Sequence, residues 1–174
     1  MQKNLLFLFT VCIGITAAAQ DNLYVTSKKL DKTYITDNKR LPDVQYQYKL
    51  RQQKPWQDFL AENGVWYVTF NEENGRPHSA YGQPINVPGG TPELKVRNFI
   101  DTKLTGFNIP SGELVLNNVG ETSKHLFVTL NQKYNGLDVL FGKFTAKLTH
   151  DSKLISWGAD VYTDITLSTT SSID

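Results

Sequence analysis

Cysteine is almost absent from this sequence, and its absence excludes a class of chemistry. The 174 residues contain one cysteine, Cys12, which lies in the apolar N-terminal leader. Once that leader is removed, the chain has no partner for a disulfide and no thiol. We therefore expect no disulfide and no cysteine nucleophile in the mature protein.

An excess of charge of either sign is also missing. The chain has 18 Lys and Arg against 17 Asp and Glu. Loss of Lys3 with the leader leaves 17 of each and a net charge of zero. Such a balance gives neither the basic face of a nucleic-acid-binding protein nor a polybasic membrane patch. We expect no nucleic-acid partner, and no membrane association after the leader is removed.

Long apolar runs are missing except at the N-terminus. The apolar core at residues 5–16 is twelve residues long, which is short of the roughly 20 residues that span a bilayer. Lys3 precedes this core and residues 17–19, all alanine, follow it, which is the layout of a secretory signal peptide. We predict that residues 1–19 are a signal peptide cleaved after Ala19, and that the protein is secreted, to the extracellular space or the periplasm.

Recognisable catalytic motifs are missing as well. A zinc peptidase needs His-Glu-x-x-His on a helix so that two imidazoles face one metal ion. Here His78, His125 and His150 stand apart from one another, and no such motif occurs. No Gly-x-Ser-x-Gly nucleophile elbow occurs either. We expect no catalytic residue, metal or cofactor in this chain, and a hydrolase whose residues follow no recognised motif stays open as an alternative.

The first half of the mature chain divides into two patterns. Residues 20–55 are polar and mostly without periodicity, which predicts an arm, and the alternation at residues 44–50 favours a short strand there. Residues 56–90 begin with one or two helical turns. A β-hairpin and a Pro/Gly-rich linker follow, so this region is predicted as a small lead-in unit.

The second half predicts a helix followed by four strands. Thr91 as N-cap and Pro92 at the first helical position begin the helix, and Leu94, Phe99, Ile100 and Leu104 share one face at helical spacing. Alternating residues and turn-forming links then predict strands at residues 113–119, 125–132, 139–149 and 154–165. The expected fold class is α+β, an antiparallel β-meander packed against one helix and preceded by a small β-hairpin unit. Residues 91–166 form this domain and residues 167–174 a Ser/Thr tail.

A series of residues from the end of the second of these strands to the start of the fourth carries a resemblance to a known family. The series is Gln132, Tyr134, Asn135, Gly136, Val139, residues 144–148, Asp151, Ser152 and Ile155. In order and spacing it resembles the FTP domain, the propeptide domain of fungalysin- and thermolysin-type zinc proteases. The match covers about residues 92–165. It departs from the family at Asp138, where proline is frequent, and at Phe141, where glycine is usual.

The resemblance implies a cystatin/PepSY-like propeptide fold and a docking function. It implies that this chain is the propeptide region of a secreted zinc metallopeptidase precursor, acting as intramolecular chaperone and inhibitor. The expected partner is the catalytic domain, in cis or in trans, and zinc is expected only there. A free-standing secreted binding or inhibitor module is the alternative. The residues expected as contact or scaffold residues are Gln132, Tyr134, Asn135, Gly136, Val139, Phe141, Lys143, Thr145 and Lys147.

Overall fold

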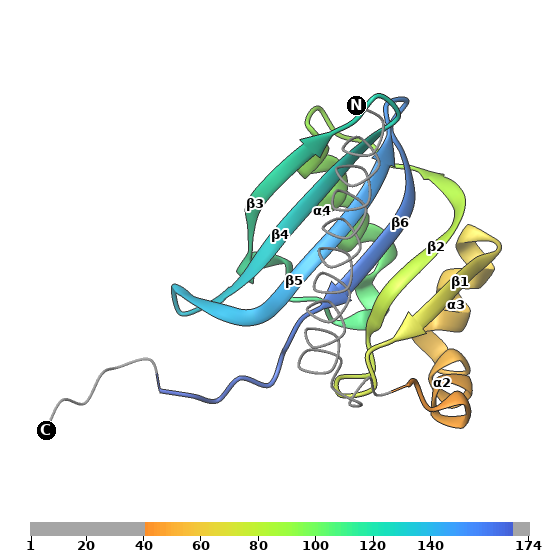
Figure 1. Cartoon of the computed structure of the whole chain (residues 1–174), viewed down its shortest axis with the longest axis vertical. Helices are drawn as coiled ribbons and strands as arrows, with labels where there is room; N and C mark the ends of the chain where they lie inside the picture. The colour runs from red at the N-terminus through yellow and green to blue at the C-terminus, as the bar shows by residue number, and fades with distance from the viewer. Residues whose placement is uncertain (1–40, 169–174) are drawn as a thin grey trace, which may run out of the picture. The chain divides into compact units, whose positions relative to one another are not determined.

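An antiparallel sheet with helices packed on one face is the centre of the structure, a computed structural model that describes residues 41–168 (Figure 1). The predicted signal peptide, the arm as far as residue 40 and the tail from residue 169 lie outside the described residues. The sheet has six strands in the order β1-β2-β6-β5-β4-β3. Its strands are β1 (Trp66–Phe70), β2 (Pro77–Asn86), β3 (Leu114–Glu121), β4 (His125–Tyr134), β5 (Leu137–Thr149) and β6 (Lys153–Asp160).

The helices of the described region are α2 (Val44–Arg51), α3 (Lys54–Asn63) and α4 (Pro92–Lys103), with short 3-10 turns η1 (Thr105–Phe107) and η2 (Ser111–Glu113). The α+β fold class is confirmed, because β3 to β6 form an antiparallel meander against α4. The predicted lead-in hairpin is present as β1 and β2. It extends the same sheet, since Ala80 of β2 pairs with Trp157 of β6.

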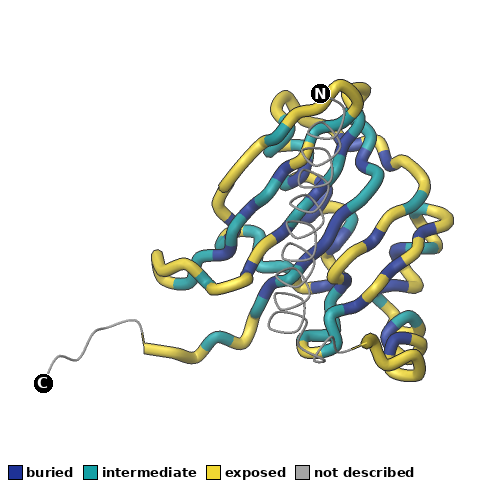
Figure 2. The backbone as a smooth tube through the Cα atoms, in the orientation of Figure 1, coloured by how far each residue is buried: buried dark blue, intermediate teal, exposed yellow. Residues whose placement is uncertain are grey.

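The core lies between the sheet and α3 and α4, and Trp157 is at its centre. This side chain is 1% exposed and has four aromatic neighbours. Their ring centroids lie 5.5 to 6.2 Å from it, in Phe59, Phe99, Phe107 and Phe144. Figure 2 shows buried positions alternating with more exposed ones along the central strands, the pattern of a sheet with one covered face.

Helix α4 begins as predicted but presents a different face. The Thr91 hydroxyl accepts a hydrogen bond from the Leu94 amide, and Pro92 takes the first turn. Leu94 itself is 50% exposed, so its expected place in the core is wrong. The buried stripe starts at Val96 and continues through Phe99 and Ile100. Leu94 lies two positions before Val96, and a residue two positions away points to another side of a helix.

The predicted strand at residues 44–50 is wrong, because this segment is helix α2. The Asp43 side chain accepts hydrogen bonds from the amides of Gln45 and Tyr46, which caps the helix. Gln47 and Leu50, three residues apart, are buried. The alternation of Val, Gln and Tyr favoured a strand, but the Asp43 cap and the helical spacing of Gln47 and Leu50 determine the structure of this segment. None of the helices formed by residues 41–168 has the length and apolar character needed to cross a membrane.

Candidate protein-docking site

The turn between β4 and β5 has the tight geometry that its sequence predicts. Asn135 has φ 48° and Gly136 has φ 85°, and the flanking residues Tyr134 and Leu137 pair with each other. Positive φ at both central residues is the requirement of the type I′ hairpin turn, which Asn-Gly satisfies at little steric cost. Asn135 and Gly136 thus form a two-residue hairpin turn, as the turn chemistry of Asn-Gly predicts.

Just beyond this turn, β5 carries a bulge. Lys133 pairs with Asp138, and the next pair along the ladder joins Asn131 to Lys143. Between these two pairs, one residue of β4, Gln132, is opposite four residues of β5, which leaves residues 139–142 without regular partners. The strand accommodates them by a sharp local bend.

Phe141 has the strained backbone conformation in this bulge. Its φ is 63°, in the left-handed region that costs a residue with a side chain roughly 1–2 kcal/mol. The adjacent Gly142 is buried, and a Cβ there would lie 2.9 Å from Val139 Cγ1 and 3.0 Å from Gln132 Cβ. Gly142 therefore packs into the interior against Val139 and Gln132, whereas the backbone conformation of Phe141 directs its side chain toward solvent.

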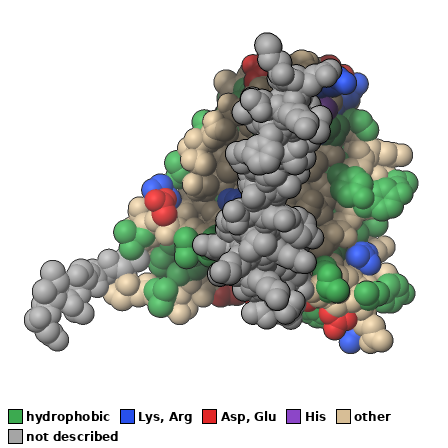
Figure 3. Space-filling model, in the orientation of Figure 1, with side chains coloured by type: hydrophobic (Ala, Val, Ile, Leu, Met, Phe, Trp, Pro, Cys, Tyr) green, Lys and Arg blue, Asp and Glu red, His purple; other side chains and the backbone are tan. Residues whose placement is uncertain are grey.

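The result is an apolar tip on the hairpin, made by Leu137, Leu140 and Phe141. Leu137 is 57% exposed, and Leu140 and Phe141 are each 76% exposed. Alternation along the predicted strand at residues 139–149 puts Leu140 on the same face as Phe144, Ala146 and Leu148, and this placement is wrong because the bulge changes the phase of the alternation. Apolar side chains gather at this end of the face shown in Figure 3. We call these three residues the hairpin tip.

Gln132 is buried and acts as an internal scaffold. It is 0% exposed. Its Nε2 donates to the Tyr162 carbonyl oxygen at 2.5 Å, and its Oε1 accepts from the Tyr162 amide at 2.9 Å. Nε2 also donates to Glu113 Oε2 at 2.8 Å. The side-chain amide thus binds the peptide groups of Tyr162 as a neighbouring strand would, and it turns the chain away from β5 after β6.

The remaining predicted contact residues fall into two groups. Asn135 and Gly136 are exposed in the turn, while Tyr134 and Val139 are half-buried beside it. Lys143, Thr145 and Lys147 lie on the sheet face opposite the helices, since Phe144, Ala146 and Leu148 between and beyond them are buried. Lys147 Nζ lies 5.5 Å from the centroid of the Phe127 ring on that face. The predicted contact residues are therefore in two places: the turn with its flanking residues, and the outer face of β5 at Lys143, Thr145 and Lys147.

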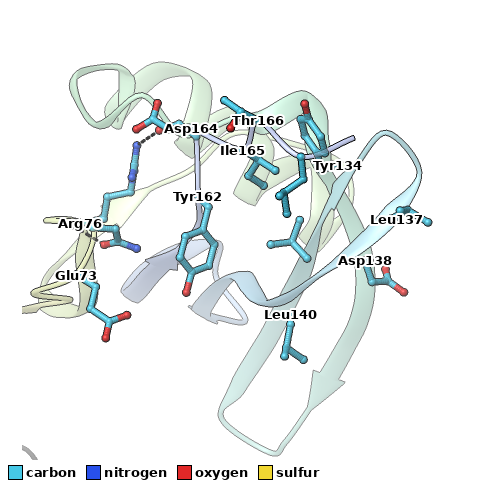
Figure 4. A pocket seen from close by; sticks show the side chains of 14 residues that line it. Glu73, Arg76, Tyr134, Leu137, Asp138, Leu140, Tyr162, Asp164, Ile165 and Thr166 are labelled. Atoms are coloured by element: carbon cyan, nitrogen blue, oxygen red, sulfur yellow. Dashed lines mark hydrogen bonds between the residues drawn. The ribbon is translucent and has the colours of Figure 1, made fainter. Parts of the chain in front are cut away.

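A groove lies between the hairpin and two distant segments. Its volume is about 820 Å³, and its walls are residues 137–140 of β5, residues 162–167 after β6, and the β1–β2 loop. Figure 4 shows Tyr162 between Glu73 and Arg76 on one side and the hairpin on the other. Sequence reasoning missed this groove because its walls are up to about 90 residues apart. The available signal was Leu167, an apolar residue in the polar tail, close to Ile165 at the end of the predicted strand.

Arg76 fixes the wall opposite the hairpin. Its guanidinium donates to the carbonyl oxygens of Phe107 and Val161 at 3.3 and 3.4 Å, and to Thr163 Oγ1 at 2.9 Å. Desolvation lowers the pKa of Arg76, and the negative charge of Asp164 partly opposes that change. The side chain keeps its charge, because an arginine pKa starts far above neutral pH. Arg76 therefore ties the segment after β6 to the β1–β2 loop.

His78 lies apart from the other two histidines, whereas His125 pairs with Thr149, the neighbour of His150. His78 Nδ1 is 2.8 Å from Asp160 Oδ2, a contact that joins β2 to β6 and that 82 residues of separation hid from the sequence. Partial desolvation, and then the charge of Lys147, lowers the pKa of His125. Within residues 41–168, no group of three or more His, Cys, Asp or Glu side chains is placed to hold a metal ion.

No family model matches this chain, and no curated protein matches it. Among solved structures, it is similar to the C-terminal domain of Bacillus megaterium YpeB, with 11% sequence identity and a TM-score of 0.36. The similarity covers 76% of this chain and 72% of that one. A similarity of this degree indicates nothing about function.

Proposed function

We propose that this chain is the propeptide region of a secreted zinc metalloendopeptidase precursor of the fungalysin/thermolysin type. It acts as intramolecular chaperone and inhibitor of a catalytic domain that the sequence does not include. On this proposal zinc and the catalytic residues belong to the partner domain, and this chain supplies contacts. The sequence resemblance around the β4–β5 hairpin motivates the partner class.

The observation that carries the proposal is the pair of apolar side chains at the hairpin tip. Leu140 and Phe141 are each 76% exposed, and Phe141 is presented by a backbone at φ 63°. Bulges and strained residues concentrate at functional sites, where they direct a side chain away from its regular position. Adjacent exposed large apolar side chains mark candidate sites of protein interaction.

Both activities follow from docking at this tip. A folded surface that binds the catalytic domain stabilises it during folding, and the same contacts hold it inactive until the connection is cut. Within one polypeptide, the local concentration of the two parts reaches the millimolar range, so even a weak interface is occupied. After cleavage the contact becomes bimolecular and dissociates more readily.

The test is inhibition of purified zinc peptidases of this type, including those that the same organism secretes. We expect the chain to inhibit at least one of them. The Leu140→Ala/Phe141→Ala double variant should inhibit at least about tenfold less well, as for loss of an interface anchor. Leu94→Ala is the matched control, because Leu94 is also an exposed leucine, 50% exposed, but lies on α4.

Circular dichroism and urea denaturation would establish that each variant is folded. Inhibition of no peptidase in the panel by the unmodified chain would contradict the proposed function. Equal inhibition by the unmodified chain and the double variant would exclude the hairpin tip as the docking site.

A further inference from the structure

Two stretches of backbone face the groove without pairing to each other. β5 pairs with β6 only from Lys143 to Leu148, so its first residues have no neighbour on that side among the described strands. After β6 the chain runs on past the hairpin instead of along β5 (Figure 1). Figure 4 shows the two stretches as opposite walls of the same groove.

The lining residues show that backbone edges face this space. Residues 137–140 of β5 and residues 162–167 both line the groove as uninterrupted runs. Successive side chains of a strand point to opposite faces, so a consecutive run lines a cavity when the strand edge is turned toward it. Within the described part of the chain, the backbone groups of residues 163–167 make no hydrogen bond to protein.

The size of the groove suits a short peptide. Its volume of about 820 Å³ lies within the range of roughly 300–1,000 Å³ typical of ligand sites. Main-chain hydrogen bonds from an open sheet edge bind extended peptides by strand addition, and side-chain pockets provide selectivity. Here one wall is the edge of β5, and the other is held in place by Gln132 and Arg76.

The charges on the walls define the chemistry of the occupant. Among the residues that line the groove, Asp138 forms an ion pair with Lys133 at 2.9 Å, and the charge of Asp164 acts on Arg76, so Glu73 is the carboxylate best placed to meet a cation of the occupant. The Arg76 guanidinium is already bonded to Val161 and Thr163 of the wall itself. Apolar side chains make up much of the rest, among them Leu137, Val139, Leu140, Ile165 and Leu167. The complement is an extended segment with apolar side chains and at least one Lys or Arg.

We propose that the groove binds such an extended, basic and apolar peptide segment, which adds as a short strand along the edge of β5 at residues 137–140. Assignment of the segment to the peptidase rests on the proposed function above, whereas binding of a peptide in the groove does not. The hairpin tip and the groove then form one continuous docking surface, because Leu137 and Leu140 belong to both.

The probe is the synthetic peptide Val-Lys-Val-Thr-Ile-Lys-Val, acetylated and amidated at its ends. Titrated into the isotope-labelled chain, it should shift amide resonances of residues 137–140 and 163–167. The same peptide with both lysines replaced by glutamate should bind at least about tenfold more weakly. A peptide with proline at the central position should also bind more weakly, because proline cannot donate to the ladder.

Two protein variants separate groove binding from general destabilisation. Gln132→Met removes the bonds that hold the Tyr162 wall and should abolish the shifts. Gln47→Met makes the same chemical change at the other buried glutamine, which binds the Phe70 peptide groups and the Glu72 carboxylate. Within the described residues this glutamine makes no hydrogen bond to β5 or Tyr162, so the variant should leave the shifts at β5 intact. Glu73→Gln should lower the affinity for the lysine-containing peptide by about threefold, the effect expected from loss of one partly exposed charge.

Several results would overturn the inference: no shift at the β5 edge, equal binding of the glutamate peptide, or binding that survives Gln132→Met. Shifts at the edge of β1 or β3 instead would place strand addition elsewhere on the sheet and also overturn it. Peptide binding without inhibition of any peptidase would refute the proposed function alone. Inhibition that depends on the hairpin tip, without peptide binding, would refute peptide binding in the groove and leave the proposed function standing.

Discussion

Replacement of Gln132 by methionine tests how the wall of the groove is held. Methionine keeps much of the side-chain length but removes two bonds to the Tyr162 peptide groups and one to the Glu113 carboxylate. A bond between neutral groups contributes about 1 kcal/mol and a bond to a charged group about 2 kcal/mol. Tyr162 is half-buried, so water replaces part of the loss. We expect a destabilisation of about 3 kcal/mol, a large part of a total near 5–15 kcal/mol.

Urea denaturation measures this loss directly. With a slope of about 2 kcal/mol per molar urea, a loss of about 3 kcal/mol moves the midpoint down by about 1.5 M. Amide hydrogen exchange adds a local readout, because the Tyr162 amide should lose protection more than the amides of β5. Gln47→Met is the comparator, since Gln47 is 3% exposed and makes the same pair of bonds, to the amide and carbonyl of Phe70.

The two variants should differ in where protection is lost. Gln47→Met should expose the Phe70 amide and leave Tyr162 protected, and Gln132→Met should do the reverse. A cost under about 1 kcal/mol for Gln132→Met, with Tyr162 protection unchanged, would refute the claim that this side chain holds the segment.

Further predictions concern the bulge, the core and one surface carboxylate. Phe141→Gly should be about 0.5–1 kcal/mol more stable than Phe141→Ala in urea denaturation, because relief of the positive φ, about 1–2 kcal/mol, exceeds the extra entropy that glycine loses on folding, about 0.5–1 kcal/mol; equal stability would argue against strain there. Trp157→Ala should cost about 4 kcal/mol by the same assay, since it leaves a cavity among four rings; a cost under about 2 kcal/mol would contradict its central place. Hydrogen bonds from Lys153 and then Thr149 lower the pKa of Asp151 from 3.8 to about 2. The depressed pKa means that the interaction is complete above pH 3.8 and is lost as the pH falls through about 2. Lys153→Met should move the Asp151 midpoint upward in an NMR titration, and an unchanged midpoint would exclude Lys153 as its main cause.

Features encoded within a few neighbouring residues were predictable from the sequence. The start of α4 depends on Thr91 and Pro92, and the β4–β5 turn on Asn135 and Gly136. In each, the backbone preference belongs to the residues themselves, as their caps and φ values show. The alternation of β5 from Lys143 onward likewise predicted which side chains are buried, namely Phe144, Ala146 and Leu148.

Features that depend on a distant partner were not predictable in the same way. Residues 161–165 alternate like a strand, yet β6 ends at Asp160. There Gln132 supplies the bonds that a ladder would have supplied, and Arg76 ties down the next residues. The outward turn of Leu140 depends on a bulge that the alternation pattern does not contain.

The sequence by itself thus determined the α+β class, the helix α4, the order of the four meander strands and the tight turn. Each of these follows from residue periodicity and short-range backbone sterics. Only the tertiary structure decided that the β1–β2 hairpin joins the sheet, and that a groove opens beside the hairpin. Those outcomes depend on pairings between side chains and strands more than 70 residues apart, such as Ala80 with Trp157, and short-range patterns carry no information about such pairings.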